Sequence, residues 1–403
     1  MTSDLTRRRA EALDAHDDLA SFRDRFEIPD GIVYLDGNSL GPPSKDVRAA
    51  VDALHDEWAA RLVHGWDRWL DVPFDVGDRL GAAVLGAAPG QVVVCDSTTV
   101  NLFKVLDAAL VYQRGLGRDV VVAEDEGFPT DRYVVAELAR RHGAEVRWYG
   151  GDATAAGIAG SLDGRVAAVV LSAVDYRSAF AVDVAEVTRA AHAHGALVVW
   201  DLCHAAGAVP LALDAWNVDL AVGCTYKYLN AGPGAPAYLY VTTRVQPQLT
   251  SPIPGWFGAD EQFTMAHDYH PRAGVGRFLA GTPNIAATVA VDAAVTTYAA
   301  AGMDRVVAKS RALTAYAVEL FDARLGATGL VLGTTRDATA RGSHLAVRHD
   351  EAARLCDDLA TRFGIVTDHR RPDVVRLGFA PLYARFTDVW DAVDALAVLM
   401  AEA

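Results

Sequence analysis

The chain has 403 residues, of which 51% are hydrophobic and 22% are charged, and this is the profile of a compact globular protein. Its 52 acidic and 37 basic residues give a formal net charge of −15, which argues against general affinity for nucleic acid or anionic membranes. No stretch approaches the roughly 20 uninterrupted apolar residues that cross a bilayer, and the N-terminus lacks the apolar core of a secretory signal. We therefore expect a cytoplasmic protein that binds neither nucleic acid nor a membrane.

The cysteines show no pair at the spacing of metal ligands or of a redox motif. Each lies among apolar residues, so we expect buried, inert thiols and no metal site. The four are Cys95, Cys203, Cys224 and Cys356.

The first two thirds of the chain predict an N-terminal segment and a large domain. Residues 1–50 are expected to pack against a small C-terminal domain, and residues 51–285 alternate short β-rich runs with helical patterns at 101–112, 131–142 and 184–194. Most β-rich runs are continuously apolar, as in strands covered on both faces. Seven strands separated largely by helices predict an α/β domain with a mostly parallel sheet. The predicted strands are Val92–Ser97, Val120–Ala123, Glu145–Tyr149, Val166–Ser172, Leu197–Asp201, Leu220–Cys224 and Ala237–Val241.

Residues 286–403 predict a smaller α+β domain. The stretch before it is interrupted by prolines and glycines and is expected to be a long loop. The predicted helices are Ile285–Ala301, Glu351–Phe363 and Thr387–Ala403, and the predicted strands are His344–Arg348 and Val374–Phe379.

Polar residues gather at the carboxyl ends of the predicted strands, where open α/β sheets bind their ligands. The set consists of Thr98 and Thr99 after the first strand, Asp131 after the second, Ser172 ending the fourth, Asp201 to His204 after the fifth, and Thr225 to Lys227 after the sixth. This clustering predicts a functional site at one edge of the sheet.

Two of these residues point to a particular cofactor. Asp201 ends a buried apolar strand, so its carboxylate needs a cation or hydrogen-bond donors. It either caps the next turn or pairs with a protonated pyridine nitrogen, which keeps that ring an electron sink. Lys227 stands between two tyrosines after the next strand, where desolvation would favour the free amine that forms a Schiff base. Together they predict pyridoxal phosphate bound through Lys227.

Thr98 and Thr99 lie between a strand and the helix expected to begin near Asn101. Hydroxyl and backbone N–H groups at a helix start can hold a phosphate, and the helix dipole favours an anion there. A plain threonine N-cap is the alternative interpretation.

Several segments, read in order, resemble kynureninase, a pyridoxal-phosphate enzyme of fold type I. They are Tyr34–Gly41, Phe128–Asp131, Asp201–Ala205, Tyr226–Gly232, Gly255–Gly258 and Phe278–Pro283. The resemblance runs from about Tyr34 to Tyr383. Its most specific block is Tyr226–Gly232, whereas the Asp-x-x-His pair also occurs in cysteine desulfurases.

The resemblance implies an aspartate-aminotransferase-like fold and a homodimer with the site at the subunit interface. It also implies hydrolysis of the Cβ–Cγ bond of L-kynurenine, of 3-hydroxykynurenine or of both. The products would be anthranilate or 3-hydroxyanthranilate, together with L-alanine. Human-type members differ around His64 and Thr282, so the ring preference stays open.

For the cofactor's phosphate, the resemblance assigns residues from both subunits. Thr98 and Thr99 match the phosphate-loop positions, and Tyr226 would hydrogen-bond the phosphate. Trp256 and Thr282 match positions that reach the phosphate from the partner subunit.

For the cofactor's ring, the resemblance assigns five residues. Phe128 would stack on the pyridine and Asp131 would contact its polar edge. Ser172 and His204 would line the ring, and Asp201 would contact its nitrogen.

For the substrate, the resemblance matches Arg376 to a carboxylate clamp and His64 to a position near the aryl group. Asn38 belongs to the Tyr34–Gly41 segment and is expected to contact the substrate. An inter-domain salt bridge is the alternative for the arginine. Its competitors for the clamp are Arg370, Arg371 and Arg385.

Three residues carry the expected catalysis. Lys227 would remove the α-proton and Asp201 would stabilise the protonated ring. Tyr226 is the candidate proton donor near the bond that breaks.

Other functions are possible on the same fold. Sulfur abstraction from cysteine and aminotransfer are the nearest alternatives, but a desulfurase needs a mobile cysteine, and Cys356 lies inside a predicted helix. A non-catalytic scaffold is a further alternative, which the intact Asp201, His204, Tyr226 and Lys227 disfavour.

Overall fold

The computed structural model describes residues 6–402, and its largest sheet has seven strands among them. Strand β8 runs antiparallel to both of its neighbours, while the other neighbouring pairs run parallel. The order across the sheet is β2 (Val92–Val94), β8 (Tyr238–Val241), β7 (Leu220–Gly223), β6 (Leu197–Asp201), β5 (Val166–Ser172), β3 (Val120–Glu124) and β4 (Glu145–Tyr149). The predicted seven-stranded, mostly parallel sheet is therefore confirmed.

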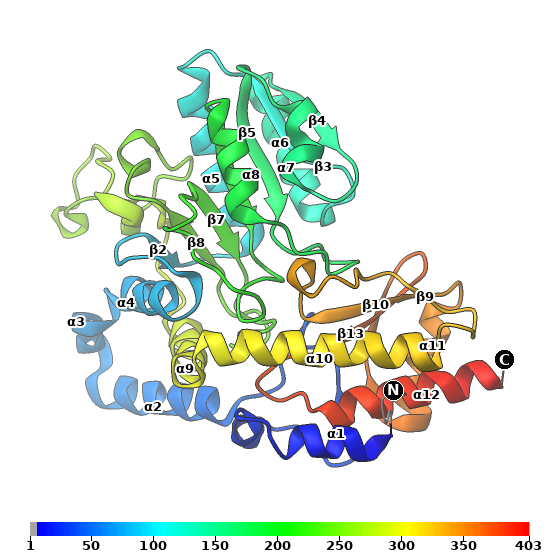
Figure 1. The fold of residues 1–403 in the computed structure, drawn as a ribbon. Helices are drawn as coiled ribbons and strands as arrows, with labels where there is room; N and C mark the ends of the chain where they lie inside the picture. The colour runs from blue at the N-terminus through cyan, green and yellow to red at the C-terminus, as the bar shows by residue number, and fades with distance from the viewer. Residues whose placement is uncertain (1–5, 403) are drawn as a thin grey trace.

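Helices cover both faces of this sheet (Figure 1). Alternate residues of one strand enter different apolar cores: Val120 and Val122 of β3 pack into one, and Val121 and Ala123 into the other. The first core contains residues of α4 (Val72–Leu80), α8 (Val184–Ala193) and α9 (Ile285–Ala301), and the second contains residues of α5 (Thr98–Arg114) and α6 (Pro129–His142). Burial on both faces explains why the strands are continuously apolar in the sequence.

Several predicted boundaries are correct to the residue, namely those of β4, β5, β6, α9 and β10 (His344–Arg348). Strand β2 is shorter than predicted, because Asp96 adopts a left-handed backbone conformation with φ +48°. Ser97 then caps α5, its hydroxyl accepting from the N–H of Val100 at 3.4 Å. The helix therefore begins at Thr98, earlier than predicted, and Thr98 and Thr99 form its first turn.

The C-terminal part holds a four-stranded antiparallel sheet packed with helices (Figure 1). Its strand order is β12 (Asp368–Arg370), β13 (Val374–Gly378), β10 (His344–Arg348) and β9 (Val331–Leu332). The helices are α10 (Met303–Arg324), α11 (Ala352–Phe363) and α12 (Phe386–Ala401). The sequence patterns did not predict α10, β9 or β12, and Ala403, predicted to end the last helix, lies outside the described residues.

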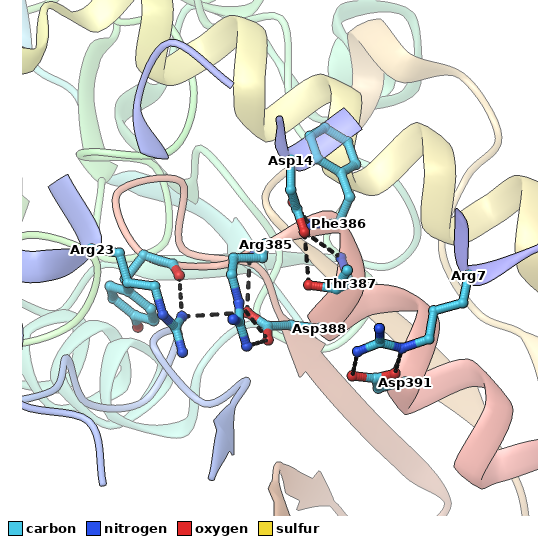
Figure 2. Close-up of polar contacts among 9 residues, drawn as sticks. Arg7, Asp14, Arg23, Arg385, Phe386, Thr387, Asp388 and Asp391 are labelled. Carbon is cyan, nitrogen blue, oxygen red and sulfur yellow. Dashed lines mark hydrogen bonds and ion pairs between the residues drawn. The ribbon is translucent and has the colours of Figure 1, made fainter. Parts of the chain in front are cut away.

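The first helix, α1 (Arg7–Asp14), lies along α12 and is bonded to its start (Figure 2). The Asp14 carboxylate accepts from the backbone N–H of Phe386 at 2.6 Å and of Thr387 at 3.1 Å. It also accepts from the hydroxyl of Thr387 at 2.7 Å. These bonds satisfy N–H groups that a helix start leaves without an intrahelical partner.

The N-terminal chain continues through contacts with both parts of the protein. Strand β1 (Val33–Tyr34) pairs in parallel with β11 (Ile365–Val366), and α2 (Lys45–Arg61) then packs along α9. The domain boundaries at residues 50 and 285 stay a prediction.

Within residues 6–402 no single helix is long and apolar enough to span a membrane, and α9 with α10 qualifies only as a pair bent by 82°. The remaining short helices are α3 (Trp66–Trp69) and α7 (Ala155–Ile158).

Candidate active site

The carboxyl ends of three neighbouring strands place the predicted polar residues side by side. Ser172 of β5 is the register partner of Asp201 of β6, and Asp201 is the partner of Val222 in β7. Thr225 to Lys227 follow β7, separated from it by Cys224 alone. A cavity of about 390 Å³ opens at this edge, and its wall includes Ser39, Asp96, Thr98, Thr99, Phe128, Asp131, Ser172, Tyr176, Asp201, His204, Tyr226, Lys227, Arg370 and Arg376.

The amine of Lys227 points into this cavity beside a histidine. Its Nζ lies 3.0 Å from Nε2 of His204 and 5.8 Å from the centre of the Phe128 ring. Burial, and then the charge of Lys227, hold the pKa of His204 well below its ordinary value of 6.5. The imidazole is therefore neutral, and its Nε2 can accept a hydrogen bond from the lysine.

Two carboxyl groups of the cavity wall, Asp201 and Asp131, lie near the lysine, and a third, Glu124, lies close to both outside the wall. Asp201 accepts from the backbone N–H of Cys203 at 2.7 Å. Burial, and then the charge of Asp201, raise the pKa of Asp131 well above its ordinary value. Burial raises the pKa of Glu124 to about 7, although its carboxylate accepts from the N–H of Ser172 at 3.2 Å. Burial and mutual repulsion therefore oppose ionisation of these neighbouring carboxyl groups, and a cation nearby would favour their charged forms.

The start of α5 forms another wall of the cavity. Thr98 is half-buried, with its hydroxyl 3.5 Å from Sγ of Cys203, and Thr99 is exposed. The first N–H groups of this 17-residue helix face an end where the helix dipole favours an anion. Tyr226 lines the same cavity, and burial raises the pKa of its phenol above the ordinary value of 10.

Arg376 also lines the cavity and lies fully buried on β13. Its Nε donates to Asp368 at 2.8 Å, its Nη1 to the carbonyl of Tyr176 at 2.7 Å, and its Nη2 to the hydroxyl of Ser39 at 3.0 Å. Asn38 is also buried, and with its amide oxygen facing the guanidinium it accepts from Nη2 at 3.1 Å. The structure thus brings together the predicted arginine and asparagine.

The competing arginines have different positions. Arg370 lines the cavity and pairs with Asp368 at 2.8 Å, whereas Arg371 is exposed. Arg385 pairs with Asp388 at the start of α12 (Figure 2). Sequence patterns missed Asp368 because β12, which places it opposite Arg376, was not predicted. Two signals could have found the missed residues: Ser39 lies inside the resembling Tyr34–Gly41 segment, and Asp368 lies near the arginines.

Four predicted residues are not part of this cavity wall: Asn38, which is buried beside Arg376, and three that are exposed. His64 is exposed in a short 3-10 helix, η2 (Leu62–Gly65). Trp256 is 43% exposed, and its indole donates to the carbonyl of Gln262 at 2.9 Å. Thr282 is exposed and borders a second cavity of about 290 Å³, which shares Asp96 with the first.

The sheet order, the smaller α+β part and the position of the site at the strand ends define the fold of the type I pyridoxal-phosphate enzymes. A cysteine desulfurase from Thermococcus onnurineus NA1 superposes with a TM-score of 0.79 at 18% identity, covering 95% of this chain and 98% of that chain. A mutant of C-DES with glycine covalently linked to its PLP cofactor superposes with a TM-score of 0.78 at 17% identity, covering 94% and 99%. Identities this low establish the fold alone, and the predicted fold class is confirmed.

Sequence comparison identifies the family. Kynureninase from Pseudomonas fluorescens is 40% identical over 402 residues, which are 98% of this chain and 95% of that protein. Kynureninase from Burkholderia pseudomallei (strain 1106a) is 40% identical over 400 residues, 97% of this chain and 94% of that protein. The kynureninase C-terminal domain model matches residues 306–396. The chain belongs to the kynureninase family, so the prediction drawn from the sequence motifs is confirmed.

Proposed function

We propose that this enzyme hydrolyses the Cβ–Cγ bond of L-kynurenine, of 3-hydroxykynurenine or of both, using pyridoxal phosphate bound at Lys227. The observation that carries the cofactor assignment is the position of the lysines. The chain has four, and Lys227 is the one that lines the cavity at the strand ends among the described residues. Lys104 and Lys309 are buried in ion pairs, and Lys45 donates to a backbone carbonyl at 2.8 Å.

The residues present fit the cofactor. The neighbouring carboxyl groups of Asp201, Asp131 and Glu124 oppose one another's ionisation, and a ring with a protonated nitrogen would relieve the cost of burying their charge. The buried Nδ1 of His204 has no hydrogen-bond partner within the described part of the chain, so this side chain can adjust to a bound group. The helix start at Thr98 and Thr99 suits a phosphate.

In this proposal each contact has a definite role. Asp201 holds the ring nitrogen in its protonated form, and Phe128 stacks on the ring. Thr98 and Thr99 hold the phosphate, and Lys227 forms the covalent link. Asp131, Ser172, His204 and Tyr226 complete the contacts with the ring and the phosphate. When bound, pyridoxal phosphate supplies an electron sink for the negative charge that develops at the substrate's α-carbon.

The remaining residues bind the substrate and move protons. Arg376 binds the α-carboxylate, because its buried guanidinium already faces the cavity, and Asn38 holds the guanidinium in place. The amine of Lys227 takes the α-proton, with neutral His204 as its neighbour at 3.0 Å. Water adds to the γ-carbonyl, the Cβ–Cγ bond breaks, and the phenol of Tyr226 supplies the proton to Cβ.

The test is a Lys227→Ala variant incubated with pyridoxal phosphate and then with kynurenine. We expect no anthranilate fluorescence and no visible absorption band from a covalently bound cofactor. Lys45→Ala, which changes a lysine outside the cavity, is the matched control and should retain both signals. Full turnover by Lys227→Ala would refute the assignment. Running both substrates in parallel gives the ring preference.

We also propose that the active form is a homodimer in which His64, Trp256 and Thr282 reach the partner's site. Their exposure and their absence from this chain's own cavity wall, as the described residues form it, support this arrangement. Mixing Lys227→Ala with Trp256→Ala subunits tests it. If Trp256 acts across the interface, each mixed dimer regains one intact site and activity returns. If Trp256 acts in its own subunit, mixing restores nothing.

Cysteine desulfuration is the second candidate, since several superposing structures are desulfurases. That reaction needs an accessible nucleophilic cysteine, and all four cysteines of this chain are buried. Burial also raises the pKa of the Cys356 thiol, on α11, to about 11, which disfavours the thiolate. Sulfide release from cysteine at a rate matching kynurenine turnover would favour this candidate.

A further inference from the structure

Lys104 is a buried cation that the proposed reaction does not use. It lies on α5, within two turns of the threonines that begin this helix, and its side chain is 0% exposed. Its Nζ pairs with the carboxylate of Asp96 and donates to the carbonyl of Phe278 at 2.6 Å. Burying an ammonium group costs several kcal/mol unless partners compensate it. Such a residue therefore needs a structural or functional reason.

Asp96 connects this lysine to the residues proposed to hold the phosphate, Asp96–Thr99, which are called the phosphate loop below. It immediately precedes Ser97, the cap of α5, and lines the same cavity as Thr98 and Thr99. Its backbone has φ +48°, and its carbonyl accepts from the N–H of Ala237 at 2.9 Å. A carboxylate at this position would repel a phosphate dianion if its charge were not balanced. Lys104 supplies that balance from beneath the loop.

The second bond of Lys104 reaches a distant part of the chain. Phe278 ends the 3-10 helix η8 (Gly274–Phe278) and lies 174 positions further along the sequence. The residues after it, through Thr282, border the second cavity. Because Asp96 lines both cavities, the lysine ties the phosphate loop to the segment that is proposed to serve the partner's site.

We propose that Lys104 is a positioning residue for the cofactor's phosphate: it cancels the charge of Asp96 and fastens the phosphate loop to the Phe278 segment. The inference rests on the proposed cofactor site and deepens it. It predicts a change in the part of the binding affinity that the cofactor's phosphate contributes. Loss of the lysine charge should weaken binding of pyridoxal phosphate far more than binding of pyridoxal, which has no phosphate.

The experiment measures the dissociation constants of pyridoxal phosphate and of pyridoxal by visible absorption. The Kd of pyridoxal divided by the Kd of pyridoxal phosphate gives the contribution of the phosphate to binding. We expect Lys104→Met to reduce this ratio by about tenfold or more. The double variant D96N/K104M should recover most of the loss, because the unbalanced carboxylate is gone. Lys309→Met is the matched control: it removes another buried lysine, paired with Asp17 at 2.6 Å, and should leave the ratio unchanged.

Two outcomes would overturn the inference. In one, Lys104→Met has the same ratio of dissociation constants as the wild type. In the other, this ratio falls equally in Lys104→Met and in the double variant. Asp96→Asn alone provides a test if Lys104→Met does not fold. It should keep or raise the ratio, and a fall would contradict the charge argument. Wild-type protein that binds both compounds equally, or neither, would instead refute the proposed cofactor site.

Discussion

Glu124, a buried carboxyl group near Asp201, offers a prediction about how the protein's stability depends on pH. Glu124 is the last residue of β3, and its carboxylate accepts from the N–H of Ser172 at 3.2 Å. Burial raises its pKa to about 7. In Glu124→Gln the side chain keeps a carbonyl oxygen for Ser172 but cannot become charged. We predict that this variant is more stable than the wild type at pH 8 and nearly equal to it at pH 5.

The magnitude follows from the pKa of Glu124. Its folded-state pKa is raised from 4.5 to about 7, so its contribution to stability is fully present below pH 4.5 and is lost as the pH rises through 7. Such a change in pKa corresponds to about 3 kcal/mol, most of it between pH 5 and pH 8. The variant escapes this loss, because its amide stays neutral at both values.

The assay is urea unfolding of the cofactor-free protein at pH 5 and pH 8. The free energy of unfolding of Glu124→Gln, relative to the wild type, should rise by about 2–3 kcal/mol between the two values. Glu126→Gln, an exposed change in the loop that follows β3, is the matched control and should show no such rise. An equal effect of Glu124→Gln at both pH values would refute the argument that ionisation of this buried group opposes folding.

Three further predictions follow from individual contacts. Asp14→Ala removes the three bonds at the start of α12 and should lower the free energy of unfolding by about 1–2 kcal/mol, measured in urea. Arg376→Lys should raise KM about tenfold or more with a smaller change in kcat, because an ammonium group cannot bind a carboxylate in bidentate fashion; a larger fall in kcat would contradict the clamp role. Tyr226→Phe should lower kcat without shifting the alkaline limb of its pH profile, since burial keeps this phenol protonated; a shifted limb would show that it ionises in the working range.

The sequence alone determined the large sheet and the edge where the site lies. β5 and β6 match their predictions because a continuous apolar run bounded by turn residues is most stable as a strand buried on both faces of a parallel sheet. Polar residues such as Asp201 and Lys227 follow such runs directly. Their meeting at one edge is a consequence of parallel strand direction.

Only the tertiary structure decided which residues surround Arg376 and Lys104. Asp368 faces Arg376 across a strand pair that no sequence pattern predicted, and Ser39 arrives from a segment more than 300 positions away. Lys104 resembles any helical lysine in the sequence, yet in the fold it is buried between Asp96 and Phe278. Local periodicity records whether a residue faces a core. It does not indicate which distant residues contact that residue, because packing between separate parts of the chain determines those contacts.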